Sequence, residues 1–277
     1  MSRRSPRRWP ALAVNGALAL LALLTAFPLL WMISASLMPT GEALTLPARL
    51  LPSQPTLQHY GTLFARLKLG RTFANTLFLA TSVTAISLLC NSMAGYAFAK
   101  LRFRGRGRLF AILLATLVVP PQVTVLPLFL EIRALGLVNS FGGVIVAGIA
   151  TVFGIFLIRQ FALAIPDELL DAARIDGASE WRIYWTIVLP ALRPILITLG
   201  VFTFLTAWND FMWPLIVLTD ESKYTLPVAL ANLSGEHVQD TELMMAGAVV
   251  TVLPGLLVFL ALQRYYVQGI LMGSLKE

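Results

Sequence analysis

The sequence predicts an all-α membrane protein with six membrane-spanning helices, and three observations carry this prediction. Hydrophobic residues make up 57% of the 277 residues and charged residues only 13%, and the mean hydropathy is +0.78. A soluble domain has a much more polar balance. Six long runs carry almost no charge, and each can supply the roughly 20 residues that a helix needs to cross the hydrocarbon core.

These runs define the expected spans and the domain organisation. The spans are expected at about 11–37, 73–99, 109–130, 138–160, 192–219 and 243–264. Lipid offers the backbone no hydrogen-bonding partner, so each run is expected to be helical. No repeat, low-complexity stretch or soluble domain interrupts them, and residues 1–277 are therefore predicted to form a single transmembrane domain.

The basic residues indicate the side of the membrane that each loop occupies. With six spans, the N-terminus, the second and fourth loops and the C-terminus share one side, and they hold 15 of the 21 lysines and arginines. Because cytoplasmic loops carry the excess of Lys and Arg, both termini are predicted to be cytoplasmic. The formal charge of +7 is therefore a topology signal. It does not predict nucleic-acid binding, because no exposed aromatic platform accompanies the basic clusters.

A polar segment at residues 165–190 is predicted to form two short helices joined by a tight turn on the cytoplasmic side. Pro166 suits the first position of a helix, and Asp167 and Glu168 place negative charge at its positive dipole end. Gly177 tolerates the left-handed geometry of a turn, and Ser179 can cap the second helix.

Two apolar surfaces are expected on this segment. One apolar face of the first helix is formed by Leu169, Leu170, Ala173 and Ile175. An aromatic stripe suited to the membrane interface is formed by Trp181, Tyr184, Trp185 and Val188. The first helix also has an alanine-rich edge that another protein could approach closely. From the residues alone, both a docking element and a simple amphipathic connector remain open.

Prolines inside the apolar runs predict bent helices. The group Val119-Pro120-Pro121-Gln122-Val123 is the best candidate for a functional bend, because each proline removes a backbone donor. Bent helices can enclose a cavity, and Pro121 and Gln122 are candidates to line it. A structural role for any single proline remains the alternative, since prolines are common in membrane helices.

The chain lacks the residue patterns of an enzyme. It contains no Gly-x-x-x-x-Gly-Lys-Ser/Thr phosphate loop, no His-Glu-x-x-His motif and no nucleophile with a nearby histidine. Cys90 is the single cysteine, and the two histidines, His59 and His237, are far apart in the sequence. We therefore predict no catalytic residues, no metal site and no cofactor in this chain.

The third external loop, residues 220–242, is acidic. Its carboxylates include Glu236, Asp240 and Glu242. They are candidates for contact with another protein, and simple solvation of the loop is the alternative.

Several stretches resemble one family of membrane proteins. Asp171-Ala172-Ala173, Asp176-Gly177-Ala178 and Ile187-Val188-Leu189-Pro190 are similar, in order and spacing, to the cytoplasmic "EAA" loop of permease subunits of ATP-binding-cassette importers. Further similarity to the carbohydrate branch, in particular the smaller permease of maltose-type systems, lies in Ala94–Gly105, Leu135–Asn139, Trp208–Leu215, Tyr224–Pro227 and Gln263–Gly269. The departure is Asp171, where the family usually has Glu; the charge is kept, but the side chain is one methylene shorter.

The resemblance implies a fold, partners and a location. It implies the type I importer permease fold in the cytoplasmic (inner) membrane of a prokaryote, with several membrane passes. The implied partners are a second permease subunit, two ATP-binding subunits, an extracytoplasmic solute-binding protein and membrane lipid, and no nucleic acid. ATP and Mg²⁺ would bind to the ATP-binding subunits. The implied cargo is a sugar or oligosaccharide.

The resemblance also assigns roles to residues. The loop would fit a groove on the ATP-binding subunit, with Asp171, Ala172, Ala173, Asp176 and Gly177 as coupling residues. Together with Pro121 and Gln122, the candidates for the translocation pathway are Trp208, Asn209 and Asp210, because a carboxylate at membrane depth usually faces the bundle interior. This triplet can either contact a sugar or hold two helices together. The acidic loop with Glu236, Asp240 and Glu242 would contact the external binding protein.

Two alternatives differ in cargo or energy source. The same architecture can import glycerol-phosphate or another polar solute. An ion-coupled secondary transporter, with Asp210 or Glu131 as proton carrier, would predict inverted repeats, and the sequence contains none that we can identify. It would also leave the cytoplasmic loop unexplained.

The topology can be tested with reporter fusions. Fusions after Arg106 and Gly177 are expected to report the cytoplasm, and fusions after Pro52 and Ser234 the exterior, because the basic residues are distributed 15 to 6 between the two sides. Alkaline phosphatase activity and fluorescent-protein maturation measure the two sides. A single reversed loop would contradict the six-span prediction.

Overall fold

The computed structural model describes residues 8–47, 49–235 and 240–274, and every regular element in these ranges is helical. The predicted all-α class is confirmed. The chain divides into two compact units. We call residues Met1–Leu69 with Asn232–Val252 the N-terminal unit, and residues Gly70–Ala231 with Leu253–Glu277 the main unit.

The N-terminal unit has a small core and one unpacked helix. It contains α1 (Arg8–Ala35), α2 (Gln58–Arg66), the end of α13 (Leu226–Gly235) and the first half of α14 (Thr241–Ser274). One of its buried clusters is formed by Leu63, Leu233, Leu243 and Ala246. By contrast, the span Val14–Ala35 is 0% buried in its most apolar window. Such an apolar surface requires lipid or another protein as its environment.

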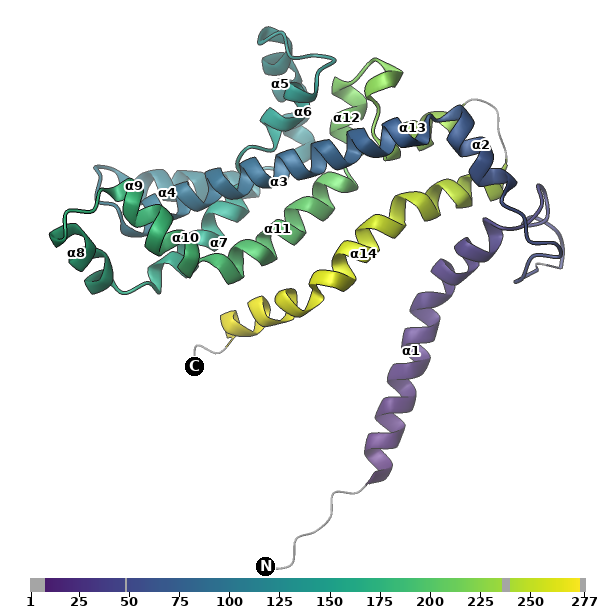
Figure 1. The fold of residues 1–277 in the computed structure, drawn as a ribbon, viewed down its shortest axis with the longest axis horizontal. Helices are drawn as coiled ribbons and strands as arrows, with labels where there is room; N and C mark the ends of the chain where they lie inside the picture. Colours follow the sequence, from purple (N-terminus) through teal and green to yellow (C-terminus); the bar gives the residue numbers. More distant parts are fainter. Residues whose placement is uncertain (1–7, 48, 236–239, 275–277) are drawn as a thin grey trace, which may run out of the picture. The chain divides into compact units, whose positions relative to one another are not determined.

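The main unit contains the remaining helices (Figure 1). In chain order they are α3 (Leu69–Lys100), α4 (Arg106–Ala115), η1 (Thr116–Val118), α5 (Pro121–Ala134), α6 (Phe141–Ala147), α7 (Val152–Leu163), α8 (Asp167–Ile175), α9 (Glu180–Ile183), the π-helical η2 (Tyr184–Val188), α10 (Leu189–Ala191), α11 (Arg193–Trp208), α12 (Met212–Val217) and η3 (Glu221–Lys223). The second half of α14 also belongs to this unit.

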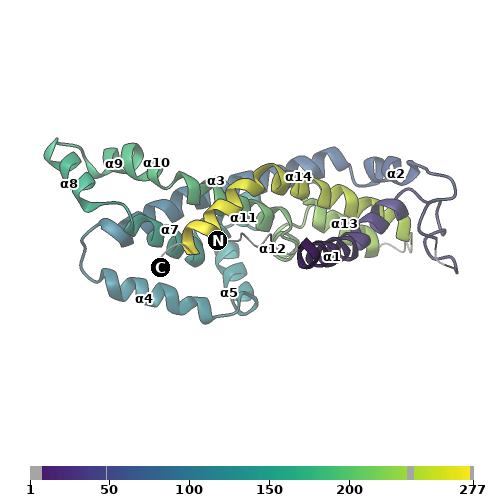
Figure 2. The ribbon, with the colours of Figure 1, turned by 90° about the horizontal axis from the view of Figure 1, so that it is seen from below.

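Not all candidate spans are straight helices. Val14–Ala35, Leu69–Lys100 and Thr241–Ala261 are long and apolar enough to cross a membrane individually. Three further spans consist of helix pairs with a sharp bend, of 110° between η1 and α5, 49° between α6 and α7 and 77° between α10 and α11. Figure 2 shows the first of these bends, where α4 and α5 diverge. It lies at Pro120-Pro121, the position that the sequence predicts for a bend. The run expected at 192–219 is also interrupted, because α11 ends at Trp208.

A buried asparagine of α3 satisfies the backbone at one of these interruptions. The Asn91 carboxamide oxygen accepts from the Thr151 backbone N–H at 2.9 Å, and its nitrogen donates to the Thr151 hydroxyl at 3.2 Å. Asn91 is 0% exposed. A broken helix at membrane depth is stable only when such partners replace the missing backbone hydrogen bonds, so Asn91 holds the junction between α6 and α7.

Asn139 has the same role for the loop after α12. Its side-chain oxygen accepts from the backbone N–H groups of Thr219 and Asp220 at 3.2 and 3.1 Å. The backbone carbonyl of Asn139 accepts a hydrogen bond from Lys223 Nζ at 2.7 Å. Asn139 has a φ of +57°, a left-handed conformation that asparagine tolerates better than most residues. One side chain thus fixes the path of the chain from α12 to η3.

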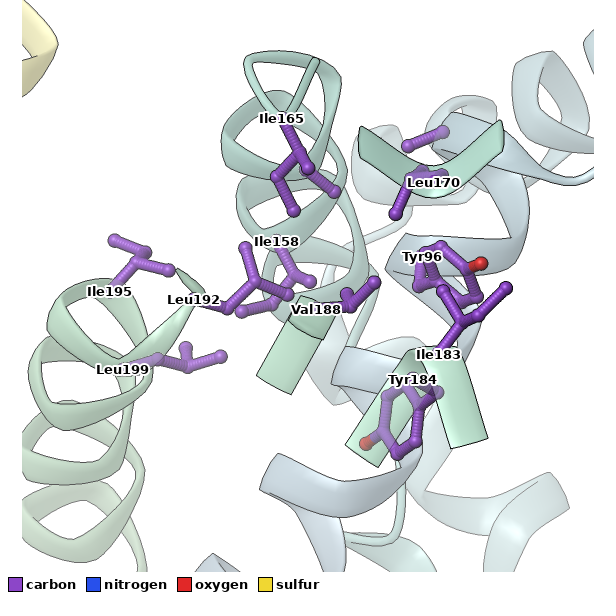
Figure 3. Packing of buried hydrophobic residues seen from close by; sticks show 12 residues of the cluster. Tyr96, Ile158, Ile165, Leu170, Ile183, Tyr184, Val188, Leu192, Ile195 and Leu199 are labelled. Carbon is purple, nitrogen blue, oxygen red and sulfur yellow. The ribbon is translucent and has the colours of Figure 1, made fainter. Parts of the chain in front are cut away.

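The largest buried cluster of the main unit ties the polar segment to the spans (Figure 3). Its residues are Tyr96, Ala99, Ile158, Ala162, Ile165, Leu170, Ile183, Tyr184, Val188, Leu192, Ile195 and Leu199. They come from α3, α7, α8, α9, η2 and α11 and from the connections next to them. At Gly95, an added Cβ would lie 2.5 Å from Ile158 Cγ2, so only glycine permits this close approach of α3 to α7.

The role of Asn91 predicts a stability effect. Asn91→Leu would leave the Thr151 N–H without its acceptor, and it is expected to lower the free energy of unfolding by about 1–3 kcal/mol. The measurement is the thermal unfolding midpoint of the purified chain in detergent. Thr81→Val is the control, because the exposed Thr81 hydroxyl bonds only to carbonyls of its own helix. Equal midpoints for both variants would contradict the role assigned to Asn91.

Candidate coupling segment and translocation cavity

The predicted helix-turn-helix is present. α8 begins at Asp167, one residue later than predicted, because Pro166 is extended and occupies the cap position. Gly177 has a φ of +81°, and the N–H of Ala178 donates to the Ala173 carbonyl at 2.9 Å, which is the Schellman closure of a helix. The Ser179 hydroxyl accepts from the Arg182 N–H at 3.3 Å and caps α9. We call residues 165–190 the coupling segment.

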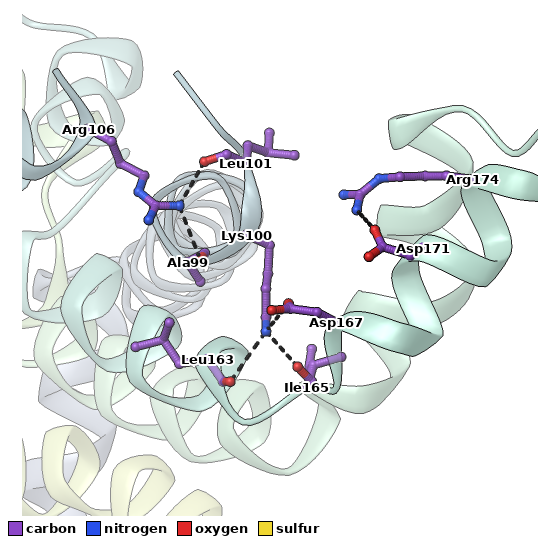
Figure 4. A network of polar contacts seen from close by, with 9 residues as sticks. All are labelled: Ala99, Lys100, Leu101, Arg106, Leu163, Ile165, Asp167, Asp171 and Arg174. Atoms are coloured by element: carbon purple, nitrogen blue, oxygen red, sulfur yellow. Dashed lines mark hydrogen bonds and ion pairs between the residues drawn. The ribbon is translucent and has the colours of Figure 1, made fainter. Parts of the chain in front are cut away.

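Lysine 100 anchors the start of the coupling segment to the end of α3 (Figure 4). Its Nζ donates to the carbonyl of Ile165 at 2.6 Å, to that of Leu163 at 3.3 Å and to Asp167 Oδ1 at 2.6 Å. The hydrogen bond and charge of Lys100 lower the pKa of Asp167. The last carbonyl of α7, a carbonyl of the connection that follows it and the first carboxylate of α8 therefore share one cation, which is itself largely buried.

A second set of polar contacts lies deeper along α3. The Tyr96 hydroxyl donates to Glu180 Oε2 at 2.7 Å, and Arg174 bridges Glu180 and Asp171, with both contacts at 2.7 Å. These two carboxylates, Glu180 first, raise the pKa of Arg174. The hydroxyls of Ser92 and Tyr184 form a hydrogen bond of 2.7 Å. Both helices of the coupling segment are thus tied to α3, and the Asp171 carboxylate is paired within the chain.

The predicted coupling residues do not all face outward. Asp171, Ala172, Asp176 and Gly177 are exposed. Ala173 is half-buried and packs against the main-unit cluster, so it supports α8 from within. The expected apolar face is also divided: Leu170 is buried, whereas Leu169 is 49% and Ile175 86% exposed.

The expected aromatic stripe is divided in the same way. Trp181 and Trp185 are exposed, but Tyr184 and Val188 are 2% and 0% exposed. The two exposed residues are four positions apart and so are the two buried ones, so each pair shares one side of the helix and the stripe lies across the boundary between its exposed and buried faces.

A cavity of about 620 Å³ lies among α3, α5, α6, α7, α11 and α12. Of the five predicted pathway residues, Pro121, Gln122 and Asp210 line it. Trp208 does not; it is 1% exposed and packs edge-on against Phe73 and in a stack with Phe204, with ring centroids 5.5 and 5.8 Å apart.

Asn209 does not line this cavity either. Its side-chain nitrogen donates to the Leu205 carbonyl at 2.8 Å and closes the end of α11. Sequence reasoning missed other polar lining residues, namely Thr124, Thr151, Thr203, Thr206 and Thr225. The signal that could have pointed to these lining residues was the presence of hydroxyl side chains within several of the apolar runs. It is a weak signal, because helical threonines commonly bond to their own backbone.

A second cavity, of about 850 Å³, is larger but less suited to a polar ligand. Its lining from α3, α10, α11 and α14 is almost entirely apolar, apart from Thr84 and Arg193. We therefore assign the candidate pathway to the smaller cavity, because more polar groups line it and residues at the helix interruptions form part of its wall.

Two acidic residues of the predicted third external loop have partners within the N-terminal unit. The Glu242 side chain is 1% exposed and accepts from the Ala43 N–H at 2.7 Å. Asp240 accepts from the Leu243 N–H at 2.8 Å and lies 3.8 Å from His59 Nδ1. Glu236 lies outside the described residues. Contact of this loop with a binding protein stays a prediction, and Glu242 is inaccessible for it in this conformation.

Comparisons with known proteins agree with this architecture. Residues 91–272 match the family model described as "Binding-protein-dependent transport system inner membrane component". The arabinooligosaccharides transport system permease protein AraQ of Halalkalibacterium halodurans is 37% identical over 261 residues, covering 93% of this chain and 94% of that protein. The lactose transport system permease protein LacG of Rhizobium radiobacter is 34% identical over 270 residues, covering 98% of each chain.

A solved structure is also similar. The crystal structure of a bacterial ABC transporter involved in the import of the acidic polysaccharide alginate contains a chain with a TM-score of 0.82 and 26% sequence identity, covering 96% of this chain and 100% of that one. The resemblance predicted from the coupling-segment motifs is confirmed. Proteins of this family are multi-pass components of the bacterial inner membrane, and ATP is handled by a separate ATPase subunit. The chain therefore belongs to the family of binding-protein-dependent transport system inner membrane components, the non-catalytic permeases of ABC importers.

Proposed function

We propose that this chain is the permease subunit of an ATP-driven importer of sugars or oligosaccharides. The observation that carries the proposal is its similarity over nearly its whole length to permeases named for arabinooligosaccharides and lactose. The complete assembly would comprise this chain, a second permease, two ATPase subunits and an extracytoplasmic solute-binding protein. Both termini and the coupling segment would face the cytoplasm, since 15 of the 21 basic residues lie on that side.

The exposed part of the coupling segment would dock on an ATPase subunit. Asp171, Ala172, Asp176 and Gly177 are exposed, and the neighbouring Ile175 is an 86% exposed apolar side chain. An apolar anchor beside small and acidic residues suits a protein groove. Ala173 would act indirectly, by holding α8 against the main-unit cluster.

Movement of the coupling segment would pass to the cavity through α3. Ser92, Tyr96 and Lys100 follow one another at four-residue spacing, and each contacts the segment or its first connection. Residues at this spacing lie on one face of a helix. About two to four turns further into the same helix, Val83 and Leu79 line the cavity. A rigid helix thus joins the proposed docking surface to the proposed pathway, which is the kind of contiguous element that transmits a displacement.

Docking can be tested at two exposed positions. Gly177→Val places a β-branched residue at a φ of +81°, where it is strained although the space is open. Ala172→Trp places a bulky ring on the exposed edge of α8. Both variants are expected to insert and fold, but to recover less ATPase subunit on purification and to lose most sugar uptake.

The control for this test is Ala134→Trp, the same substitution at an exposed residue near the end of α5, which should not change recovery of the ATPase subunit. Subunit ratios on gels and uptake of labelled sugar into the same cells provide the two measurements. Wild-type ATPase recovery for both variants would mean that the segment is only a connector.

The role of α3 can be tested separately from docking. Lys100→Met removes the shared cation at the start of α8, and we expect the ATPase subunits to remain bound and active while the sugar moved per ATP falls several-fold. Proteoliposomes containing the assembled transporter allow both rates to be measured together. Lys223→Met is the matched control, because Lys223 also donates to a carbonyl, that of Asn139, but belongs to an external loop. An unchanged ratio of transport to hydrolysis in Lys100→Met would contradict transmission through this contact.

A further inference from the structure

The smaller cavity has polar groups of a restricted kind. They include Gln122, Thr151, Thr203, Thr206, Asp210 and Thr225. Asp210 is the only ionisable side chain among the described residues that line the cavity, and that lining contains no lysine, arginine or histidine. The remaining polar groups are hydroxyls and one carboxamide. A ligand in this cavity would therefore meet neutral hydrogen-bonding groups and a single negative charge.

Thr225 supplies an independent observation. Its side chain is 3% exposed, and within the described part of the chain its hydroxyl has no hydrogen-bond partner. The backbone around it is satisfied, because the Leu226 N–H donates to the Thr76 hydroxyl at 2.8 Å and the Thr225 carbonyl accepts from Ala229 at 2.9 Å. Buried hydroxyls in folded proteins nearly always have partners. Thr225 is also among the residues that line the cavity, so a ligand group that reaches its hydroxyl would supply the missing partner.

The carboxylate of Asp210 also has capacity to spare. It accepts from the backbone N–H groups of Trp213, at a long 3.4 Å, and of Met212, whereas an ionised carboxylate can accept about four hydrogen bonds. Nearby, Trp213 is fixed by its indole N–H, which donates to the Gly143 carbonyl at 3.2 Å. Phe153 and Phe202 add aromatic surface to the same lining. Hydrogen-bonding groups beside aromatic surface match a sugar ring, which has hydroxyls on its edge and C–H groups on its faces.

An anionic ligand would find no cationic side chain in the described lining to compensate its charge. The α5 helix begins at Pro121, which has no N–H. At the N-terminus of α7, the Thr151 N–H is held by Asn91 and the Gly154 N–H by the Thr151 hydroxyl. A carboxylate or phosphate in the cavity would also be repelled by Asp210, and this repulsion is stronger where water is partly excluded.

We infer that this cavity is a binding subsite for an uncharged sugar ring, in which Thr225 and Asp210 bond its hydroxyls, and that it discriminates against acidic and phosphorylated sugars. The inference rests on the proposed function. It gives this chain direct contact with the cargo, and it disfavours the glycerol-phosphate alternative.

Ligand protection of a cysteine tests this inference without the binding protein. Thr203→Cys, in a Cys90→Ser background, places one thiol on the cavity wall of the assembled transporter in detergent. The probes are lactose and arabinotriose, and their aldonic acids, in which the reducing-end carbon is oxidised to a carboxylate and the other sugar rings are unchanged. We expect the neutral sugars to slow maleimide labelling at concentrations at least about tenfold lower than the acids, the effect of one unfavourable charge contact of roughly 1.4 kcal/mol.

Three variants then test the named groups. Thr225→Val should weaken protection by the neutral sugars about three- to tenfold, the range for one net hydrogen bond. It should not lower the thermal midpoint of the empty transporter, since no internal bond is lost. Thr225→Ser should retain protection, and Asp210→Asn should reduce the preference for neutral over acidic sugars. Thr84→Val is the control, because the Thr84 hydroxyl bonds to Ala80 within α3 and does not line this cavity.

The outcomes separate this inference from the proposed function. Equal protection by acids and neutral sugars, no protection by any neutral sugar, or unchanged protection in Thr225→Val would each overturn the subsite. A marked loss of thermal stability in Thr225→Val would assign its hydroxyl a structural role and would overturn it as well. Uptake of labelled neutral sugars by cells carrying the complete system tests the proposed function by itself: uptake without protection rejects the subsite alone, and absence of sugar uptake rejects both.

Discussion

Hydrogen bonds from the polar side chains of one long helix hold the irregular parts of the main unit in place. The α3 side chains that make these bonds are Asn75, Thr76, Asn91, Ser92, Tyr96 and Lys100. They reach the loop before α13, the break between α6 and α7, and the coupling segment. Unpaired backbone groups are costly where water is absent. Bent and broken spans are therefore possible here because a neighbouring straight helix supplies the missing partners.

Through these contacts, α3 connects the coupling segment with the cavity wall and with the loop that carries Thr225. The contacts at the C-terminal end of α3 hold the coupling segment, and the contacts near its start hold the loop that carries Thr225. Between them, Leu79 and Val83 form part of the cavity wall. Gly95 lets α7 pack closely on the same helix. A displacement of the coupling segment would therefore act on the helix that also shapes the cavity.

The charge pattern differs between the two functional regions. In the coupling segment, Asp167 and Glu180 have lowered pKa values because each is paired with a cation, Lys100 for Asp167 and Arg174 for Glu180. In the cavity, Asp210 has no such cation among the described lining residues. Paired charges fix the position of a structural element, whereas a carboxylate without a counter-charge remains available to hydroxyl donors. The two regions thus use the same residue type for different physical purposes.

The sequence by itself determined the features that depend on composition or on a few neighbouring residues. Apolar runs set the helical class, Pro120-Pro121 set a sharp bend, and Gly177 and Ser179 set the turn and the cap of the coupling segment. The family was also predictable, because its motifs in the coupling segment are contiguous and close in spacing.

Only the tertiary structure decided which way individual side chains face. Ala173 and Tyr184 turn inward although the sequence suggested outward roles, and Trp208 packs among aromatic rings while Thr225 lines the cavity. In spans that are apolar on every side, periodicity does not mark an inner face. The partners that decide orientation are also distant in sequence, as for Asn91 and Thr151, which are 60 residues apart, and such pairings become visible only when the helices are packed together.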